Sequence, residues 1–392
     1  MTAIGTEAAA ILEAVEGILP GLRENSLEAE ERRWIPDENI ALLEKTGIFR
    51  MGVPRRFGGL DLPLAEQIKI LTELPRGCGS TGWVAMVWAA CTWLATLYPE
   101  QAQQEVFADS PARISGGFTP SGSVVPADGG FVLNGTWRFN TGCRGAHWDI
   151  LAALQEHPDG QVEQVFALVP MADLTVADDW DVTSGSGTGS CSVSAKDVFV
   201  PAHRVASGME ATTGGSPERS ADMTPGRNYY LTGFVNSCAI ATYIGIAKAV
   251  LELFTATAQR RGISYTSWTE QHKHPLTQIK VATAANQIAA AEALSDSYIA
   301  LMQERADAGE LPTVEEMAAF HGKSGYALQL VRDAVTELHS ISGASVIARK
   351  DPFQRHFRDM MGFSLHGMMA PHVNLELHGR VLLGLDPGTD VL

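Results

Sequence analysis

The chain has 392 residues, 45% hydrophobic and 19% charged, as in a soluble globular protein long enough for two or three domains. Its formal net charge of -16 and its lack of lysine- and arginine-rich runs argue against a nucleic-acid partner. Five cysteines without a CxxC spacing, and an acidic start without a signal-peptide pattern, favour a reduced protein of the cytoplasm. The most apolar stretch, from Trp83 to Leu97, is shorter than the roughly 20 residues that span a membrane.

The first third of the chain has the pattern of helices. Apolar residues from Ile11 to Leu19 recur at helical spacing. Pro36-Asp37 is typical of a helix start, and Gly47 of a helix end. A further helix is expected from Glu66 to Leu74. The stretch from Trp83 to Leu97 is apolar on all sides, which predicts a buried helix.

The middle of the chain changes to short strands. Asp128-Gly129 and Asn134-Gly135 are typical of tight turns, and the alternation from Thr136 to Phe139 predicts a half-buried strand. Apolar runs that include Ile150-Leu151, Val165–Val169 and Val198–Val200 add further strands. This spacing predicts a small β-barrel or sandwich. The segment Asn140-Thr141-Gly142 follows one strand, and its glycine permits an unusual backbone turn.

The last part of the chain is helical again. Residues 207–227 are rich in Gly, Ser, Thr and Pro, which indicates either an interdomain loop or a lid. Thr313 and Glu316 form a capping-box pattern at the start of a later helix. The apolar helix faces predict a bundle that also supplies an oligomer interface. We therefore expect a helical domain at 1–112, a β-domain at 113–206, the linker or lid at 207–227 and a helical bundle at 228–392.

Familiar catalytic motifs are missing from the sequence. It has no GxxxxGK[ST] loop, no GxGxxG after a strand and no HExxH. A GxSxG pattern occurs around Gly185, but no apolar strand leads into it, so a nucleophile elbow is not predicted. Histidines such as His272 and His274 lack ligand partners at suitable spacing, and no metal site is predicted.

Four segments together carry a family resemblance. They are GWVAMVWAACTWLATLYPEQAQQEVF (82–107), GTWRFNTGCRGAHW (135–148), VSAKDVFVP (193–201) and QRHFRD (354–359). In this order they resemble the acyl-CoA dehydrogenase-like flavoproteins, and most closely their two-component (group D) flavin-dependent monooxygenase branch. The resemblance implies an α+β fold with an N-terminal helical domain, a central β-barrel or sandwich and a C-terminal four-helix bundle. It also implies a homotetramer.

The resemblance implies a flavin site between the β-domain and the bundle. Thr141 falls where a hydroxyl meets flavin N5, and Arg260 or Arg261 falls where a guanidinium holds the diphosphate. Gln278 would lie on the adenosine side. The other implied cofactor contacts are Phe118, Thr119, Pro120, Ser121, Phe139, Gly343 and Ala344.

The choice between dehydrogenase and monooxygenase depends on a missing carboxylate. Acyl-CoA dehydrogenases usually carry a glutamate base two helical turns after the arginine-aspartate pair, where this chain has Gly367 preceded by His366. Other dehydrogenases place the glutamate on the earlier long helix, but residues 228–250 contain no Asp or Glu. His366 instead matches the histidine of the monooxygenase branch, where an imidazole can exchange a proton near neutral pH.

A reduced-flavin-dependent monooxygenase is therefore the expected activity. Through a flavin C4a-hydroperoxide it would hydroxylate a phenolic, indolic or other heteroaromatic small molecule, with His366 and Thr141 as catalytic residues. The expected cofactors are O₂ and reduced flavin, FADH2 in preference to FMNH2, supplied by a separate NAD(P)H:flavin reductase. Trp83, Cys91, Phe363 and Met369 are the expected substrate-pocket residues, Cys91 standing where several branch members carry a second histidine. Open alternatives are amine or amino-sugar N-oxygenation, acyl-CoA dehydrogenation and a flavin-free binding scaffold.

Overall fold

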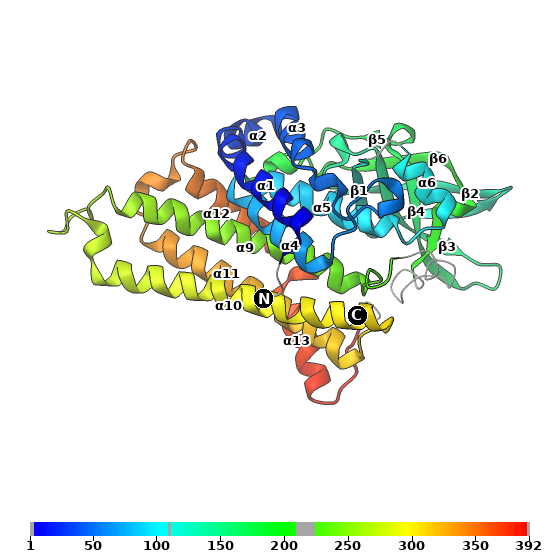
Figure 1. Cartoon of the computed structure of the whole chain (residues 1–392). Coiled ribbons are helices and arrows are strands. Elements are labelled where there is room, and N and C mark those ends of the chain that lie inside the picture. The colour runs from blue at the N-terminus through cyan, green and yellow to red at the C-terminus, as the bar shows by residue number, and fades with distance from the viewer. Residues whose placement is uncertain (1–3, 109–110, 209–223, 390–392) are drawn as a thin grey trace.

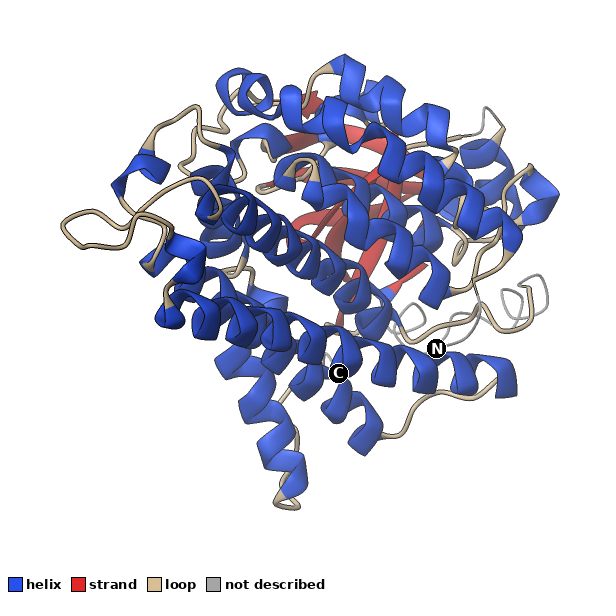
Figure 2. Cartoon of the chain, turned by 60° about the vertical axis from the view of Figure 1, so that its left-hand side comes forward, coloured by secondary structure: helices blue, strands red, loops and turns tan. Residues whose placement is uncertain are grey.

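The computed structural model describes residues 4–108, 111–208 and 224–389 of the chain. The elements follow the expected order of helices, strands and helices (Figure 1). The strands gather at one end of the molecule, and the long C-terminal helices extend away from them. In the turned view of Figure 2, helices lie in front of the strands, so the sheet is covered rather than open on that side.

Six α-helices form the N-terminal part: α1 (Thr6–Glu24), α2 (Ser26–Arg32), α3 (Asp37–Thr46), α4 (Leu64–Glu73), α5 (Gly79–Ala95) and α6 (Glu100–Phe107). Helix α3 begins after Pro36 and ends before Gly47, as the sequence predicts. Helix α5 is buried on nearly every side, which confirms the interpretation of its apolar sequence. It packs against both the sheet and the C-terminal helices, and thereby joins the two halves of the molecule.

The strands are β1 (Ile114–Ala127), β2 (Gly130–Trp137), β3 (Trp148–Glu156), β4 (Val162–Pro170), β5 (Thr175–Val176), β6 (Val193–Pro201) and β7 (Val205–Ser207). They form one mixed sheet of order β5-β6-β2-β1-β3-β4-β7, in which β1 and β3 are parallel and the other neighbours antiparallel. Val124, Leu133, Trp137 and Leu151 belong to the apolar cluster of this sheet, separate from the larger helical core.

Two local predictions in the β-domain are wrong. Asp128-Gly129 does form the turn between β1 and β2, but Asn134-Gly135 lies inside β2, at a shift in its register with β6. The Asn134 side chain accepts a hydrogen bond of 2.8 Å from the Asp197 N–H, so a cross-strand contact replaces the expected turn. Strand β2 ends at Trp137, and Phe139 lies beyond it with a positive φ of 59° and 66% of its surface exposed.

The C-terminal helices are α9 (Leu231–Ala258), α10 (Pro275–Ala308), α11 (Val314–Ser340), α12 (Pro352–Phe363) and α13 (Pro371–Leu382). The predicted capping box at Thr313 and Glu316 is present. Helix α9 is long and apolar enough to cross a membrane by length and composition, but 83% of its apolar window is buried by the rest of the protein. The predicted linker or lid falls largely on residues 209–223, which lie outside the described residues.

Candidate active site

Helix α5 brings the predicted site residues of both halves together. At one end the Trp83 ring stacks on Phe363 at a centroid distance of 4.3 Å and lies 5.8 Å from the His366 ring. Further along, the Trp88 Nε1–H donates a hydrogen bond of 3.3 Å to the Gly142 carbonyl. One helix therefore contacts the turn that carries Thr141 and the segment that carries His366.

A buried hydrogen-bonded pair, Asn140 and Asp149, supports the turn Asn140-Thr141-Gly142. The Asn140 side-chain amide donates to the Asp149 carboxylate at 2.7 Å, and the Asn140 N–H donates to the Cys191 carbonyl at 3.2 Å. Burial raises the pKa of Asp149 to about 7. Gly142 adopts a φ of +76°, and a Cβ there would lie 2.7 Å from Trp88 Nε1, so only glycine fits.

A chain of three buried hydroxyl groups runs from Thr141 into the neighbouring loop. Thr141 Oγ1 lies 2.8 Å from Ser190 Oγ, which lies 2.7 Å from Thr188 Oγ1. The Thr188 hydroxyl donates to the Gly185 carbonyl at 2.8 Å. We call Thr141, Ser190 and Thr188 the hydroxyl chain. The sequence does not predict the hydroxyl chain, because its one signal, the run of Ser, Thr and Gly around Gly185, matches only a GxSxG pattern without a strand before it.

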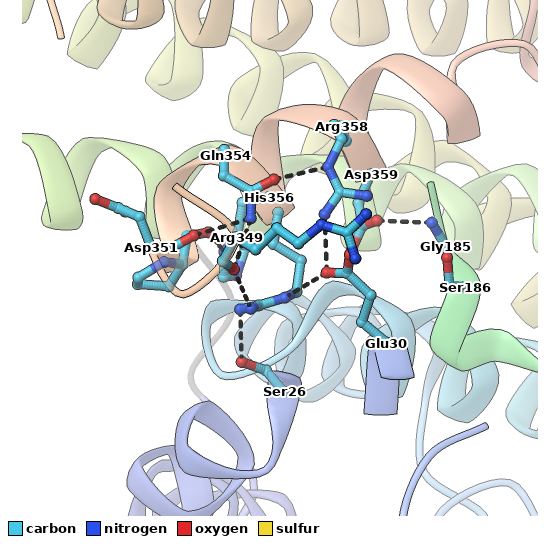
Figure 3. Close-up of polar contacts among 12 residues, drawn as sticks. Ser26, Glu30, Gly185, Ser186, Arg349, Asp351, Gln354, His356, Arg358 and Asp359 are labelled. Atoms are coloured by element: carbon cyan, nitrogen blue, oxygen red, sulfur yellow. Dashed lines mark hydrogen bonds and ion pairs between the residues drawn. The ribbon is translucent and has the colours of Figure 1, made fainter. Parts of the chain in front are cut away.

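Gly185 connects the hydroxyl chain to helix α12. Its N–H donates to Asp359 Oδ1 at 2.7 Å, as Figure 3 shows. Its φ is +61°, and a Cβ there would lie 2.4 Å from the Phe363 ring. Only glycine fits at position 185, because the backbone is left-handed and the Phe363 ring leaves no room for a Cβ atom. Burial raises the pKa of Asp359 to about 6, although the Gly185 N–H and Arg358 oppose this shift.

The rest of the QRHFRD segment forms an ion-pair network, which we call the α12 network (Figure 3). Glu30 of α2 accepts hydrogen bonds from Arg355 at 2.9 Å and from Arg358 at 2.8 Å. Arg358 also donates to the Thr183 carbonyl. Burial opposes the charge on Glu30, but the two guanidinium groups lower its pKa below the usual value. The network ties the N-terminal domain, the bundle and the loop of the hydroxyl chain together.

His366 lies just beyond the end of α12. The Tyr243 hydroxyl of α9 donates to the Phe363 carbonyl at 2.6 Å, and the His366 N–H donates to the same carbonyl at 2.9 Å. The His366 residue is exposed to solvent, yet nearby protein atoms partly desolvate the imidazole, and this desolvation lowers its pKa. Among the described residues no side chain hydrogen-bonds to the ring. This lowered pKa favours the neutral imidazole, and within the described residues both of its ring nitrogens lack a hydrogen-bond partner.

Phe118, Thr119, Pro120 and Ser121 lie where β1 departs from its neighbour. The pairing of β1 with β3 is interrupted between Gly117 and Gly122, which leaves these four residues between its two parts. Thr119, Pro120 and Ser121 are exposed, whereas Phe118 contacts Phe166 edge-on at 6.1 Å. Exposed residues of β1 that lack pairing with β3 suit the polar edge of a flavin ring, because their backbone N–H and C=O groups can bond to it.

The residues predicted to hold the rest of the cofactor lie on the C-terminal helices and their connections. Arg261 donates to the Ile341 carbonyl at 2.8 Å and also to Ser342 and Gln271, so three of its five donors are used within the chain. Arg260, Gln278, Gly343 and Ala344 are exposed. The fold thus places an exposed guanidinium at Arg260, while Arg261 supports the turn that contains Gly343.

The four predicted substrate-pocket residues do not form one group. Trp83 and Phe363 stack on each other, and Met369 is buried in the short turn that follows His366. Cys91 is fully buried, and a Cβ on Gly116 would lie 3.0 Å from its sulfur, so it packs against β1. Trp83 and Phe363 therefore form the aromatic wall beside His366.

The carboxylates nearest the two places where acyl-CoA dehydrogenases carry their glutamate base are paired with arginines in this structure. The first carboxylate of α9 is Glu252, which pairs with Arg23 at 2.9 Å and with Arg76 at 2.6 Å. Glu376 is exposed on α13 and pairs with Arg380. Within the described residues, neither position offers a free carboxylate that could take an α-proton from an acyl thioester.

Comparison with known proteins decides the family. The models for the acyl-CoA dehydrogenase N-terminal and C-terminal domains match residues 7–112 and 237–371. The FADH(2)-dependent resorcinol hydroxylase oxygenase component of Rhizobium sp. (strain MTP-10005) is 32% identical, over 95% of this chain and 94% of that protein. The chain belongs to the acyl-CoA dehydrogenase-like superfamily. Within it, the chain is an oxygenase component of the two-component flavin-dependent monooxygenases.

Two further relatives extend this assignment. The p-hydroxyphenylacetate 3-hydroxylase oxygenase component of Acinetobacter baumannii is 28% identical, over 96% of this chain and 90% of that protein. The structure of XiaF from Streptomyces sp., in complex with FADH2 and glycerol, is 29% identical and superposes with a TM-score of 0.93 over 98% of both chains. The oxygenase component therefore shares its whole length, and not one domain, with these enzymes.

Proposed function

We propose that this oxygenase component inserts one oxygen atom of O₂ into the ring of a phenolic or related heteroaromatic substrate. The observation that carries this proposal is the exposed His366, with its lowered pKa, beside the Trp83–Phe363 wall, where the described residues offer no free carboxylate base. Reduced flavin, when bound, would supply two electrons, so that with two protons one oxygen atom leaves as water while the other converts a ring C–H into C–OH. Two named relatives that act on phenols support this substrate class.

Each side of the site has its own task in this proposal. Thr141 binds the flavin at N5, and Phe118–Ser121 bind the polar edge of the ring. Arg260, Gln278 and the Gly343-Ala344 turn hold the diphosphate and adenosine side, with Arg261 supporting that turn through Ser342. A guanidinium suits a diphosphate because it donates paired hydrogen bonds. Phe139, exposed at the end of β2, contacts the cofactor from the β-domain.

His366 acts as the proton acceptor for the substrate. Because its pKa is lowered, the imidazole is neutral and able to take the proton of a phenol O–H or ring N–H as the ring is oxygenated. The aromatic faces of Trp83 and Phe363 provide apolar contact for a flat ring. Several members of the monooxygenase branch carry a second histidine at the position of Cys91. In this chain that position holds a fully buried cysteine, so the role of the second histidine is absent there.

The proposal includes a supply of reduced flavin from outside. A separate NAD(P)H:flavin reductase reduces the cofactor in the cytoplasm, with FADH2 preferred to FMNH2. The protein assembles as a homotetramer, in which a neighbouring subunit completes the diphosphate site. Exposed apolar residues on α13 and just after it support this association: Val373, Leu382, Leu383 and Leu385. Light scattering tests the assembly, and a monomer would contradict the shared site.

The decisive experiment follows the oxygen atom. The protein is mixed without oxygen with reduced FAD and resorcinol, or with indole in a parallel sample, and then exposed to ¹⁸O₂. We expect one ¹⁸O atom in the hydroxylated product of at least one probe. Failure to oxygenate any of a panel of phenols and indoles, together with reduction of bound oxidised FAD by an acyl-CoA, would instead identify a dehydrogenase.

A further inference from the structure

The hydroxyl chain determines which way the Thr141 proton points. A carbonyl oxygen can only accept, so the 2.8 Å contact between Thr188 Oγ1 and the Gly185 carbonyl uses the single Thr188 proton. Thr188 must then accept from Ser190 across their 2.7 Å contact, which uses the Ser190 proton. Ser190 in turn must accept from Thr141 across 2.8 Å.

The reverse order of donors is disfavoured by the same distances. If Thr188 donated to Ser190, and Ser190 to Thr141, the Thr188 and Gly185 oxygens would face each other at 2.8 Å without a hydrogen between them. Water does not offset such a contact here, because Thr188, Ser190 and Thr141 expose only 1%, 4% and 7% of their surfaces. The Asp359 carboxylate also holds Gly185 in place by accepting its N–H at 2.7 Å.

We propose that Thr188 and Ser190 are positioning residues that make Thr141 a hydrogen-bond acceptor toward the flavin. This inference rests on the proposed function, which assigns Thr141 to flavin N5. Reduced flavin carries a hydrogen on N5, whereas oxidised flavin has a lone pair there. A Thr141 oxygen whose proton is committed to Ser190 therefore pairs with reduced flavin and opposes the lone pair of oxidised flavin.

The consequence is selectivity between the two redox states of the cofactor. An oxygenase component that takes up reduced flavin and must later release oxidised flavin gains from such a preference. The residues responsible are 49 and 47 positions from Thr141, and they lie on a loop anchored by α12 rather than in the turn that carries Thr141. Asp359 of α12 is thereby connected to Thr141 through Gly185 and the hydroxyl chain.

The test compares the affinities of FAD and dithionite-reduced FAD, measured anaerobically by fluorescence titration. In Ser190→Ala the Thr141 proton loses its acceptor and becomes free to bond with N5 of oxidised flavin. We expect the preference for reduced over oxidised FAD to fall about two- to tenfold, the worth of one neutral hydrogen bond. Thr188→Val, which keeps the branched shape and deletes the hydroxyl, should change the preference in the same direction.

Ser192→Ala is the matched control. This hydroxyl is also buried, but it donates to Asp179 at 2.6 Å and does not contact the hydroxyl chain. Its loss should leave the preference unchanged. A Ser190→Ala protein that weakens both redox states equally, or neither, would overturn the inference. If the wild-type protein binds neither redox state of FAD or of FMN, the proposed function itself fails, and this outcome is distinct because it does not involve the variants.

Discussion

The two sides of the site differ in how much the fold constrains their polar groups. On the β-domain side, Thr141 is buried and its hydroxyl has a partner, Ser190, that is itself bonded to Thr188. On the bundle side, the His366 imidazole is partly accessible and, within the described residues, no side chain bonds to it. Both sides contact helix α5, so the difference does not come from separate scaffolds.

The difference matches the proposed roles. A group that distinguishes two redox states must hold one hydrogen-bond direction, so its proton is committed by neighbours that water cannot reach. A group that exchanges a proton with substrate needs free ring nitrogens and a neutral state near pH 7. The first three of the following predictions are ordered from the largest expected effect to the smallest, and a fourth concerns the pH dependence of stability.

Replacing His366 should have the largest effect on chemistry. We expect His366→Asn to slow oxygenation roughly 10²–10⁴-fold, because an amide cannot exchange a proton near neutral pH. Flavin affinity and thermal stability should change little, since the ring has no structural hydrogen bond to lose. His372→Asn, an exposed histidine on α13, serves as the control. Near-normal product formation in stable, flavin-binding His366→Asn would remove His366 from the mechanism.

Breaking the α12 network should instead cost stability. Arg355→Ala leaves Glu30 with one guanidinium partner in a largely buried place, and we expect the free energy of unfolding to fall by about 3 kcal/mol. Denaturant unfolding measures the loss. Arg380→Ala breaks an exposed pair with Glu376 and should cost less than about 0.5 kcal/mol. Equal effects of the two substitutions would show that the network does not hold the domains together.

Removing the Thr141 hydroxyl should have a smaller effect than the loss of His366. We expect Thr141→Ala to release more hydrogen peroxide for each product formed, because one neutral hydrogen bond is worth about 0.5–1.5 kcal/mol. The ratio of peroxide to hydroxylated product measures this coupling. The fold should remain intact, which circular dichroism verifies. Coupling equal to that of the wild type would place Thr141 outside the site.

The last prediction concerns pH and the carboxylate of Asp149, which is buried next to the Thr141 turn. Burial raises the folded-state pKa of Asp149 to about 7, while an unfolded Asp has a pKa near 3.9. The stability due to its proton is therefore present below about pH 4 and is lost as the pH rises through 7. Asp149→Asn stays neutral, so its Tm should fall less than that of the wild type between pH 5 and 8. Exposed Asp173→Asn is the control, and parallel Tm profiles for Asp149→Asn and wild type would contradict the prediction.

Local sequence patterns determined most of the architecture. A stretch apolar on all sides predicted the buried α5, and apolar helix faces predicted the C-terminal bundle, because such patterns are properties of each segment itself. Capping residues located the starts of α3 and α11 for the same reason. The Asn134-Gly135 prediction failed where a cross-strand contact with Asp197 outweighed local turn preference.

Only the tertiary structure decided the details of the site. The sequence suggested Thr141 and His366 through resemblance, but it could not indicate that Ser190 accepts the Thr141 proton or that Asp359 anchors Gly185. Those contacts join segments that are distant along the chain, and the direction of each hydrogen bond depends on the acceptor that the fold places beside it. The lowered pKa of His366 likewise arises from desolvation in the folded protein, which depends on the tertiary packing around the ring.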